Sequence, residues 1–192
     1  MNSDRVRTHQ LSHGKLEGSL IDGTPVIFEQ FRFNESAEQA NLFIQAILAQ
    51  HKRRQWDKSV ESLRMAGPIV NRNMLVFEEV SKELVSGSIN RSALLKQFIF
   101  RANGALYVYT SSVQDSVAAE DDSERESAPR YCLAFQILCF RREGEDLVVE
   151  RLQQIDFRQG DNESMNNLFI KAKEVKSRYW QQDLIEAVQA AK

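Results

Sequence analysis

A basic segment that contains an aromatic ring is the first candidate for chemistry in this sequence. It follows an apolar helical pattern, begins at His51, and holds Lys52, Arg53, Arg54, Trp56 and Lys58. Lys and Arg side chains neutralise phosphates, and an exposed Trp ring can stack on bases. One alternative is therefore a nucleic-acid-binding accessory protein that uses these last five residues on one exposed face. The competing interpretation is a helix end with matching cations and a Trp ring packed against a second helix.

The last third of the chain offers a second candidate, a site for a protein partner. Tyr179 and Trp180 are adjacent in a long amphipathic pattern, and Leu184 follows on the apolar side. Aromatic residues are enriched in the energetic centres of protein interfaces. We therefore expect Tyr179, Trp180 and Leu184 to cover the sheet or to dock another protein or a second copy of the chain.

A third candidate is a face of four aromatic side chains around the dipeptide Asn103-Gly104. The dipeptide predicts a two-residue hairpin turn, which would place Phe98 opposite Tyr109 and Phe100 opposite Tyr107. Such a face could stack single-stranded bases, as RNA-binding sheets do. The side of the hairpin that carries these rings lacks interleaved Lys or Arg, which favours a place in the core.

The motifs of common catalytic and metal sites are absent from the sequence. It has no dinucleotide or phosphate-binding glycine loop, no His-Glu-x-x-His and no Gly-x-Ser-x-Gly. Cys132 and Cys139 are seven residues apart, which places them on opposite faces of one strand as two small thiols. We expect no catalytic residue, no metal and no cofactor, although an active site assembled from distant residues stays possible.

Composition indicates an ordinary folded domain. The chain has 192 residues, of which 42% are hydrophobic and 27% charged, with a formal net charge of −2. These values exclude a disordered or disulfide-dense chain and give no strong attraction to nucleic acid or anionic membranes. The polar N-terminal stretch does not resemble a secretory signal, and no run is long and apolar enough to span a bilayer. We expect a cytoplasmic protein.

The first part of the chain predicts a tail, a hairpin and a helix. Residues 1–14 are polar and predict a mobile N-terminal tail. Apolar alternation predicts strands at 15–21 and 26–33, joined by an Asp-Gly turn. A helical pattern follows, with Asn34 or Ser36 as its cap, and it runs to the basic residues 51–54.

The middle of the chain predicts two further helices and an exposed loop. Helical spacing predicts short helices at 57–65 and 73–85. The hairpin of residues 97–110 follows. Residues 114–129 carry many acidic and few apolar side chains, which predicts a disordered acidic loop.

The last part of the chain predicts two strands and a long helix. Residues 131–142 form an apolar run typical of a central strand, and residues 147–157 predict a less buried strand. The long final helix begins at Asn162 or Ser164 and carries a wide apolar stripe.

Together these elements predict an α+β fold. Its mainly antiparallel sheet consists of the N-terminal hairpin and a four-strand meander, packed against two or three central helices and the long C-terminal helix. Residues 15–192 are expected to form a single domain.

The absence of catalytic motifs favours a non-catalytic protein-interaction or regulatory factor. It would work as an adaptor, a chaperone-like subunit or an assembly component, with a homodimer as one form. Besides the nucleic-acid alternative, a second alternative is an enzyme with a cryptic pocket between sheet and helices, which needs convergent polar groups there.

Overall fold

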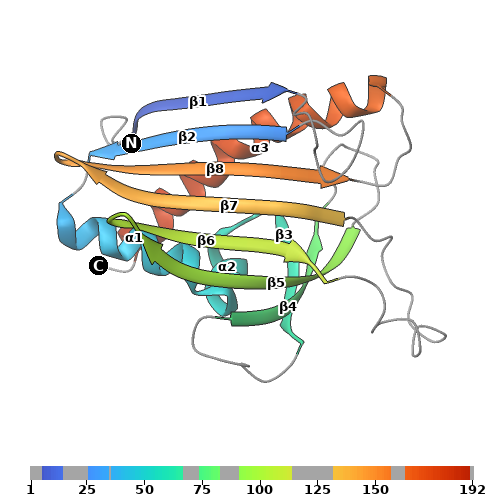
Figure 1. Ribbon diagram of the computed structural model, residues 1–192, viewed down its shortest axis with the longest axis horizontal. Helices are drawn as coiled ribbons and strands as arrows, with labels where there is room; N and C mark the ends of the chain where they lie inside the picture. Colours follow the sequence, from blue (N-terminus) through green and yellow to red (C-terminus); the bar gives the residue numbers. More distant parts are fainter. Residues whose placement is uncertain are drawn as a thin grey trace.

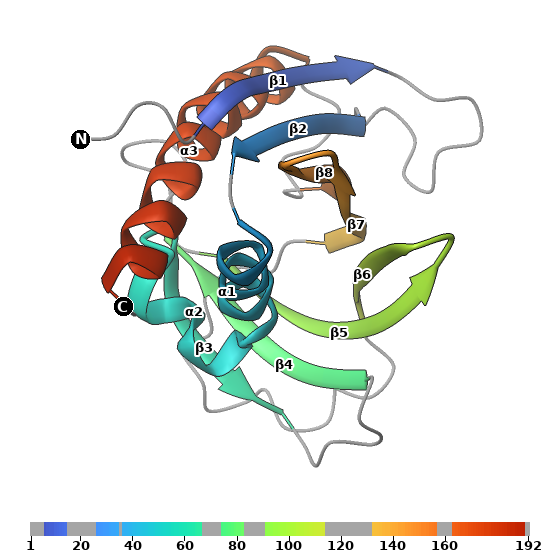
Figure 2. The ribbon, with the colours of Figure 1, turned by 90° about the vertical axis from the view of Figure 1, so that its left-hand side faces the viewer.

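The computed structural model shows an antiparallel sheet of eight strands that curls around its helices (Figures 1 and 2). The structure describes residues 6–14, 26–34, 36–66, 74–82, 91–113, 132–156 and 163–190. The strand order is β1-β2-β8-β7-β6-β5-β4-β3, so all neighbours except β2 and β8 are consecutive in sequence. The predicted α+β class and antiparallel sheet are confirmed, but the sheet is one long curled layer and not a hairpin plus a four-strand meander.

The elements have the following bounds. The strands are β1 (Val6–Gly14), β2 (Val26–Asn34), β3 (Val60–Met65), β4 (Met74–Ser81), β5 (Arg91–Ala102), β6 (Ala105–Ser112), β7 (Cys132–Glu143) and β8 (Asp146–Asp156). The helices are α1 (Ala37–Leu48), α2 (Gln50–Trp56) and α3 (Glu163–Ala190).

The N-terminal part of the fold differs from the prediction. Residues 6–14, predicted as part of a mobile tail, form strand β1 and pair along β2. A polar sequence suffices there because β1 lies at the edge of the sheet, beside a single neighbouring strand. Strand β2 confirms the strand predicted at 26–33. The strand predicted at 15–21 and its Asp-Gly turn lie outside the described residues.

Two predicted helices are strands. Residues 57–65 contribute β3, and residues 73–85 contribute β4, which pairs with both β3 and β5. In β4, Phe77 and Glu79 face the inside of the curled sheet, and both are buried. An inward-facing carboxylate breaks the apolar alternation by which strands are recognised, so the helical spacing of the other residues was misleading.

The helix predicted up to residues 51–54 is present as two helices. The Ser36 hydroxyl accepts a hydrogen bond from the Gln39 backbone N–H at 3.3 Å, which caps the first turn of α1. Ala49, with ψ of 72°, leaves the helical conformation and separates α1 from α2. The two helices therefore present their side chains to the sheet at different angles.

The strongest local prediction, the hairpin around Asn103-Gly104, is confirmed. Asn103 and Gly104 both have positive φ, at 49° and 74°, as a two-residue turn of this type requires. Phe100 pairs with Tyr107, as predicted. Strands β7 and β8 and the final helix α3 are also present where the sequence indicates them.

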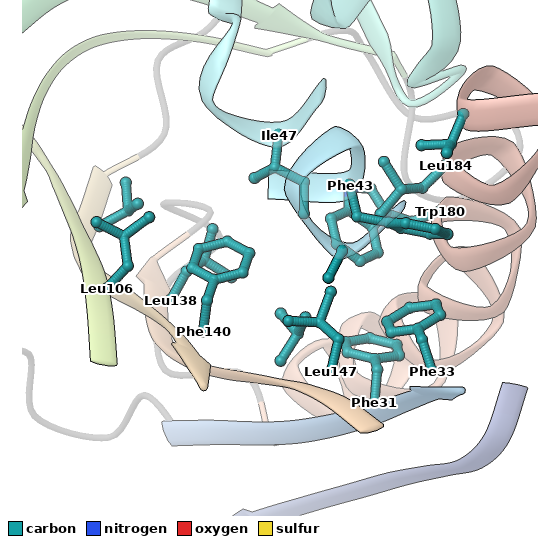
Figure 3. Close-up of a cluster of buried hydrophobic side chains, with 14 of the residues drawn as sticks. Phe31, Phe33, Phe43, Ile47, Leu106, Leu138, Phe140, Leu147, Trp180 and Leu184 are labelled. Atoms are coloured by element: carbon teal, nitrogen blue, oxygen red, sulfur yellow. The ribbon is translucent and has the colours of Figure 1, made fainter. Parts of the chain in front are cut away.

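The main core fills the space between the concave face of the sheet and helices α1 and α3 (Figure 3). Phe31 and Phe33 from β2, Phe43 from α1 and Leu184 from α3 are fully buried there. Strand β8, predicted as less buried, lies near the middle of the sheet and is buried along most of its length. Its position between β2 and β7 explains the difference, because both of its edges are paired.

Helix α3 buries only part of its predicted apolar stripe. Among the side chains of α3 that the structure describes, the exposed large hydrophobic ones are Leu168, Val175 and Tyr179. No described helix has a segment long and apolar enough to cross a membrane. The predicted acidic loop at 114–129 lies outside the described residues, and the single domain expected for residues 15–192 stays a prediction.

Candidate functional site

A cavity of about 120 Å³ lies between the concave face of the sheet and the helices. All three described helices and strands β4–β8 contribute side chains to its wall. Side chains alternate along a strand, so every second residue of β4, β5 and β8 reaches it, and in β7 an irregularity after Leu133 shifts the alternation by one residue. Space of this size can hold several water molecules or one small organic molecule.

Apolar side chains wall the cavity on two sides. On the side of the main core lie Ile47, Leu138 and Trp180, which Figure 3 shows converging from α1, β7 and α3. On the other side lies a second, smaller cluster that includes Leu95 and Leu133. The cavity thus separates two apolar clusters of the same molecule.

Both tryptophans of the chain border this cavity. Trp56 and Trp180 lie with ring centroids 5.9 Å apart in an edge-to-face arrangement. The indole N–H of Trp56 donates a hydrogen bond to the Ala46 carbonyl oxygen at 3.3 Å. This bond satisfies the only polar group of that ring and leaves its apolar surface to pack.

A row of polar side chains crosses the middle of the concave face. Its members are direct neighbours on four adjacent strands, β5 to β8, and all four border the cavity: Gln97, Thr110, Gln136 and Gln153. Gln97, Thr110 and Gln153 are buried. The row lies between the two apolar clusters, so the cavity is polar along its middle and apolar on either side.

A buried ion pair supports one end of this polar row. The Arg151 guanidinium donates to the Glu29 carboxylate across strands β8 and β2, and both side chains are almost completely buried. Arg151 also lies 4.8 Å from the ring centroid of Trp180, a cation–π contact. The Gln153 amide nitrogen donates to the same Glu29 oxygen at 3.1 Å. These contacts fix the side chains of Arg151 and Gln153 in place.

A second network of charges closes the cavity near α2. Arg53 contacts Asp57 and Glu79, each at 2.8 Å. Burial acts to raise the pKa of Asp57, but the Arg53 charge and hydrogen bonds from Ser59 and Arg53 outweigh it and hold the pKa below 3.8. Asp57 is therefore a carboxylate at neutral pH, and the network stays charged.

The basic segment predicted to bind nucleic acid does not form one exposed face. Arg53 points to Asp57 and Glu79, and Trp56 is buried against Trp180. Lys52 and Arg54 are exposed, and Lys58 is exposed and pairs with Asp183 at 2.7 Å. The structure thus divides the five residues between the cavity wall and the surface. The single face that the nucleic-acid alternative requires is absent.

The residues predicted to contact a partner are divided in the same way. Tyr179 is 62% exposed, whereas Trp180 is 7% and Leu184 0% exposed. Trp180 and Leu184 belong to the main core. Of the three, only Tyr179 faces solvent.

Sequence analysis missed the polar side chains that border the cavity. Arg151 and Gln153 lie on the same face of β8 as the buried Leu147 and Val149, and a glutamine recurs on the inner face of β5, β7 and β8. Polar residues at the inward positions of otherwise apolar strands were the available signal. In the sequence this mixture of residues favours a less buried strand, although it marks a polar row inside the fold.

Comparisons with known proteins identify the fold. The sequence matches no protein-family model, and no curated protein matches it. Human StAR-related lipid transfer protein 5 has a similar structure, with a TM-score of 0.74 and 10% identity over 96% of this chain and 83% of that one.

Two bacterial structures are also similar. A STAR-related lipid transfer protein fragment from Xanthomonas axonopodis has a TM-score of 0.66 and 11% identity, covering 92% of this chain and 93% of that one. The Zhui aromatase/cyclase from a Streptomyces species has a TM-score of 0.56 and 9% identity, covering 85% and 93%.

These similarities correct the predicted function. The prediction of a non-catalytic adaptor or regulatory factor, and its nucleic-acid alternative, are wrong, because the matching structures are lipid-transfer domains and an aromatase/cyclase. The pocket between sheet and helices that the enzyme alternative required is present. The chain has the curled-sheet and long-helix fold of StAR-related lipid transfer domains.

Proposed function

We propose that this protein binds a small, largely apolar molecule in the cavity between its curled sheet and its helices. The observation that carries the proposal is the cavity itself, bordered by Trp56, Trp180 and two apolar clusters. Transfer of apolar surface from water to such a site is favourable by about 25 cal/mol per Å². The names of the similar structures, lipid transfer proteins and an aromatase/cyclase, support the same class of ligand. The proposal keeps the cytoplasmic location expected from the sequence.

The charged groups near the cavity favour a neutral ligand body. Arg151 and Arg53 are each held by carboxylates, Glu29 for the first and Asp57 with Glu79 for the second. A ligand charge would compete with these internal pairs and lose its own hydration. The energy of binding therefore comes mainly from apolar contact and from neutral hydrogen bonds.

Titration with two rigid bicyclic compounds, borneol and camphor, tests the proposal. Both tryptophans border the cavity, so a bound molecule should change the intrinsic tryptophan emission in a saturable way. Leu138→Phe should narrow the cavity and weaken binding about tenfold or more. Ile137→Phe, one residue earlier on β7 and on the opposite face, is the matched control and should bind like the wild type. Absence of a saturable signal with both compounds would overturn the proposal.

A further inference from the structure

Three amide oxygens at the cavity wall lack a partner. The side-chain oxygens of Gln50, Gln97 and Gln153 are buried and accept no hydrogen bond from any described residue. Buried polar atoms in folded proteins are nearly always hydrogen-bonded, and an unpaired acceptor costs free energy. Three such acceptors around one cavity indicate that its contents supply hydrogen-bond donors.

Gln153 is the acceptor whose orientation the structure determines. Its amide nitrogen donates to the Glu29 carboxylate at 3.1 Å, and an ionised carboxylate only accepts hydrogen bonds. Rotating the Gln153 amide by half a turn would place its oxygen against that carboxylate. The Glu29 carboxylate is itself held by Arg151. The Gln153 oxygen is therefore fixed as the group turned away from Glu29, and the residue is 0% exposed.

The other two amides are less constrained. The Gln97 nitrogen lies 3.5 Å from the Thr110 hydroxyl, and the Gln50 nitrogen lies 3.4 Å from the Ile47 carbonyl oxygen. Both contacts are at the long limit of a hydrogen bond. These two amides can rotate and offer either a donor or an acceptor to a ligand. These two amides can pair with either kind of ligand group, whereas the fixed oxygen of Gln153 requires a donor.

We propose that the ligand of this cavity carries a hydroxyl or N–H group that donates a hydrogen bond to the Gln153 side-chain oxygen. This inference rests on the proposed function and adds to it the chemical class of the ligand. The apolar clusters on either side of the polar row accommodate the ligand's apolar body. The class is a compact apolar molecule with a hydroxyl or a neutral N–H donor, and not a hydrocarbon, ether or ketone of the same shape.

Borneol and camphor test the donor requirement directly. They share one carbon skeleton, but borneol carries a hydroxyl donor where camphor carries a ketone oxygen, which only accepts. A site with a fixed acceptor discriminates strongly against a molecule without the donor. In the wild-type protein we expect borneol to bind about tenfold or more tightly than camphor, measured by tryptophan emission.

A pair of variants assigns the preference to one residue. Gln153→Met removes the acceptor and keeps the side-chain length, so the preference for borneol should fall to about twofold or less. Ile155→Met, two residues further along the same face of β8 and also at the cavity wall, should keep the wild-type preference. Circular dichroism and thermal melting of each variant verify the fold.

The outcomes separate this inference from the proposed function. Equal binding of both compounds to the wild type, or tighter binding of camphor, overturns the donor requirement and leaves apolar ligand binding standing. An unchanged preference in folded Gln153→Met overturns the role of Gln153. Binding of neither compound overturns both. The wild-type comparison decides the donor requirement even where Gln153→Met does not fold.

Discussion

The concave face of the curled sheet buries polar side chains, whereas its convex face leaves aromatic side chains exposed. On the concave face of β5, Gln97 is buried, whereas Phe100 on the convex face of the same strand is 49% exposed and stacks on Tyr107 with ring centroids 5.2 Å apart. The helices cover only the concave side (Figure 2). The position of the helices thus decides which side chains are buried, and residue polarity alone does not.

Each face also holds an ion pair between strands, in different surroundings. Arg151 and Glu29 on the concave face are almost completely buried, whereas Arg141 and Glu150 on the convex face are partly exposed. Removing one partner of an ion pair costs far more folding free energy in the interior than at the surface. The two pairs therefore allow the effect of burial to be measured within one sheet.

Replacing one aromatic ring on each face of the sheet should give the largest difference in the free energy of unfolding. Phe33→Ala removes a 0% exposed ring from the main core and should lower the free energy of unfolding by about 3–5 kcal/mol. Phe100→Ala removes a stacked surface ring and should cost about 1 kcal/mol or less. Urea denaturation followed by circular dichroism measures both. Losses of similar size would contradict the assignment of the two faces.

Removing the arginine from each ion pair should also destabilise the protein more on the concave face than on the convex face. Arg151→Met leaves the Glu29 carboxylate buried without its cation and should cost about 3–5 kcal/mol. Arg141→Met leaves Glu150 partly in contact with water and should cost about 1 kcal/mol or less. Chemical denaturation again provides the comparison. If Arg151→Met is as stable as Arg141→Met, the inner pair is not essential to the fold.

Lowering the pH should weaken the ion pair between Arg141 and Glu150 on the convex face. The hydrogen bond from Arg141 holds the pKa of Glu150 below 4.5, although partial burial acts against it. A lowered pKa means that the pair stabilises the fold above about pH 4.5 and that this contribution is lost as pH falls through the folded-state pKa. Arg141→Gln should move the Glu150 pKa back toward 4.5, as carboxyl-carbon NMR would show. An unchanged titration of Glu150 would mean that Arg141 is not the cause.

The smallest expected effect concerns Tyr107 on the convex face. Its hydrogen bond with Cys139 is the main cause that raises the Tyr107 pKa above 10.0. Cys139→Ala should therefore shift the ultraviolet titration of this tyrosine to lower pH and leave the fold intact. Tyr107→Phe identifies which tyrosine signal moves. A titration that Cys139→Ala leaves in place would show that the thiol does not perturb Tyr107.

Local signals made part of the fold predictable from the sequence. The Asn103-Gly104 turn and its register depend on the φ angles of two residues, which their types determine. The cap at Ser36 and the long amphipathic pattern of α3 are equally local. In contrast, β4 was predicted as a helix because Glu79 faces inward to Arg53, a partner 26 residues earlier in the chain. No local pattern shows that contact.

The candidate site depends on contacts between distant residues to an even greater degree. Gln97 and Gln153 lie at the two ends of the polar row, and only the pairing of four strands brings them into it. Trp56 is in a basic segment of the sequence, and only packing against Trp180 turns its ring away from solvent. Tyr179 and Trp180 are adjacent in sequence, yet the geometry of α3 sends one to solvent and the other to the core. Residue types indicated possible contacts, and the topology decided between them.

The position of β8 between β2 and β7 has a consequence for how the chain is made. Glu29 and its partner Arg151 are 122 residues apart, so β2 cannot gain its central neighbour until the ribosome has synthesised β8. At typical synthesis rates this delay lasts roughly 6–24 seconds. Throughout it, the apolar β2 edge is uncovered, while β3 to β7 can already pair in order. The nascent chain therefore needs protection at β2, and completion of the sheet is among the last steps of folding.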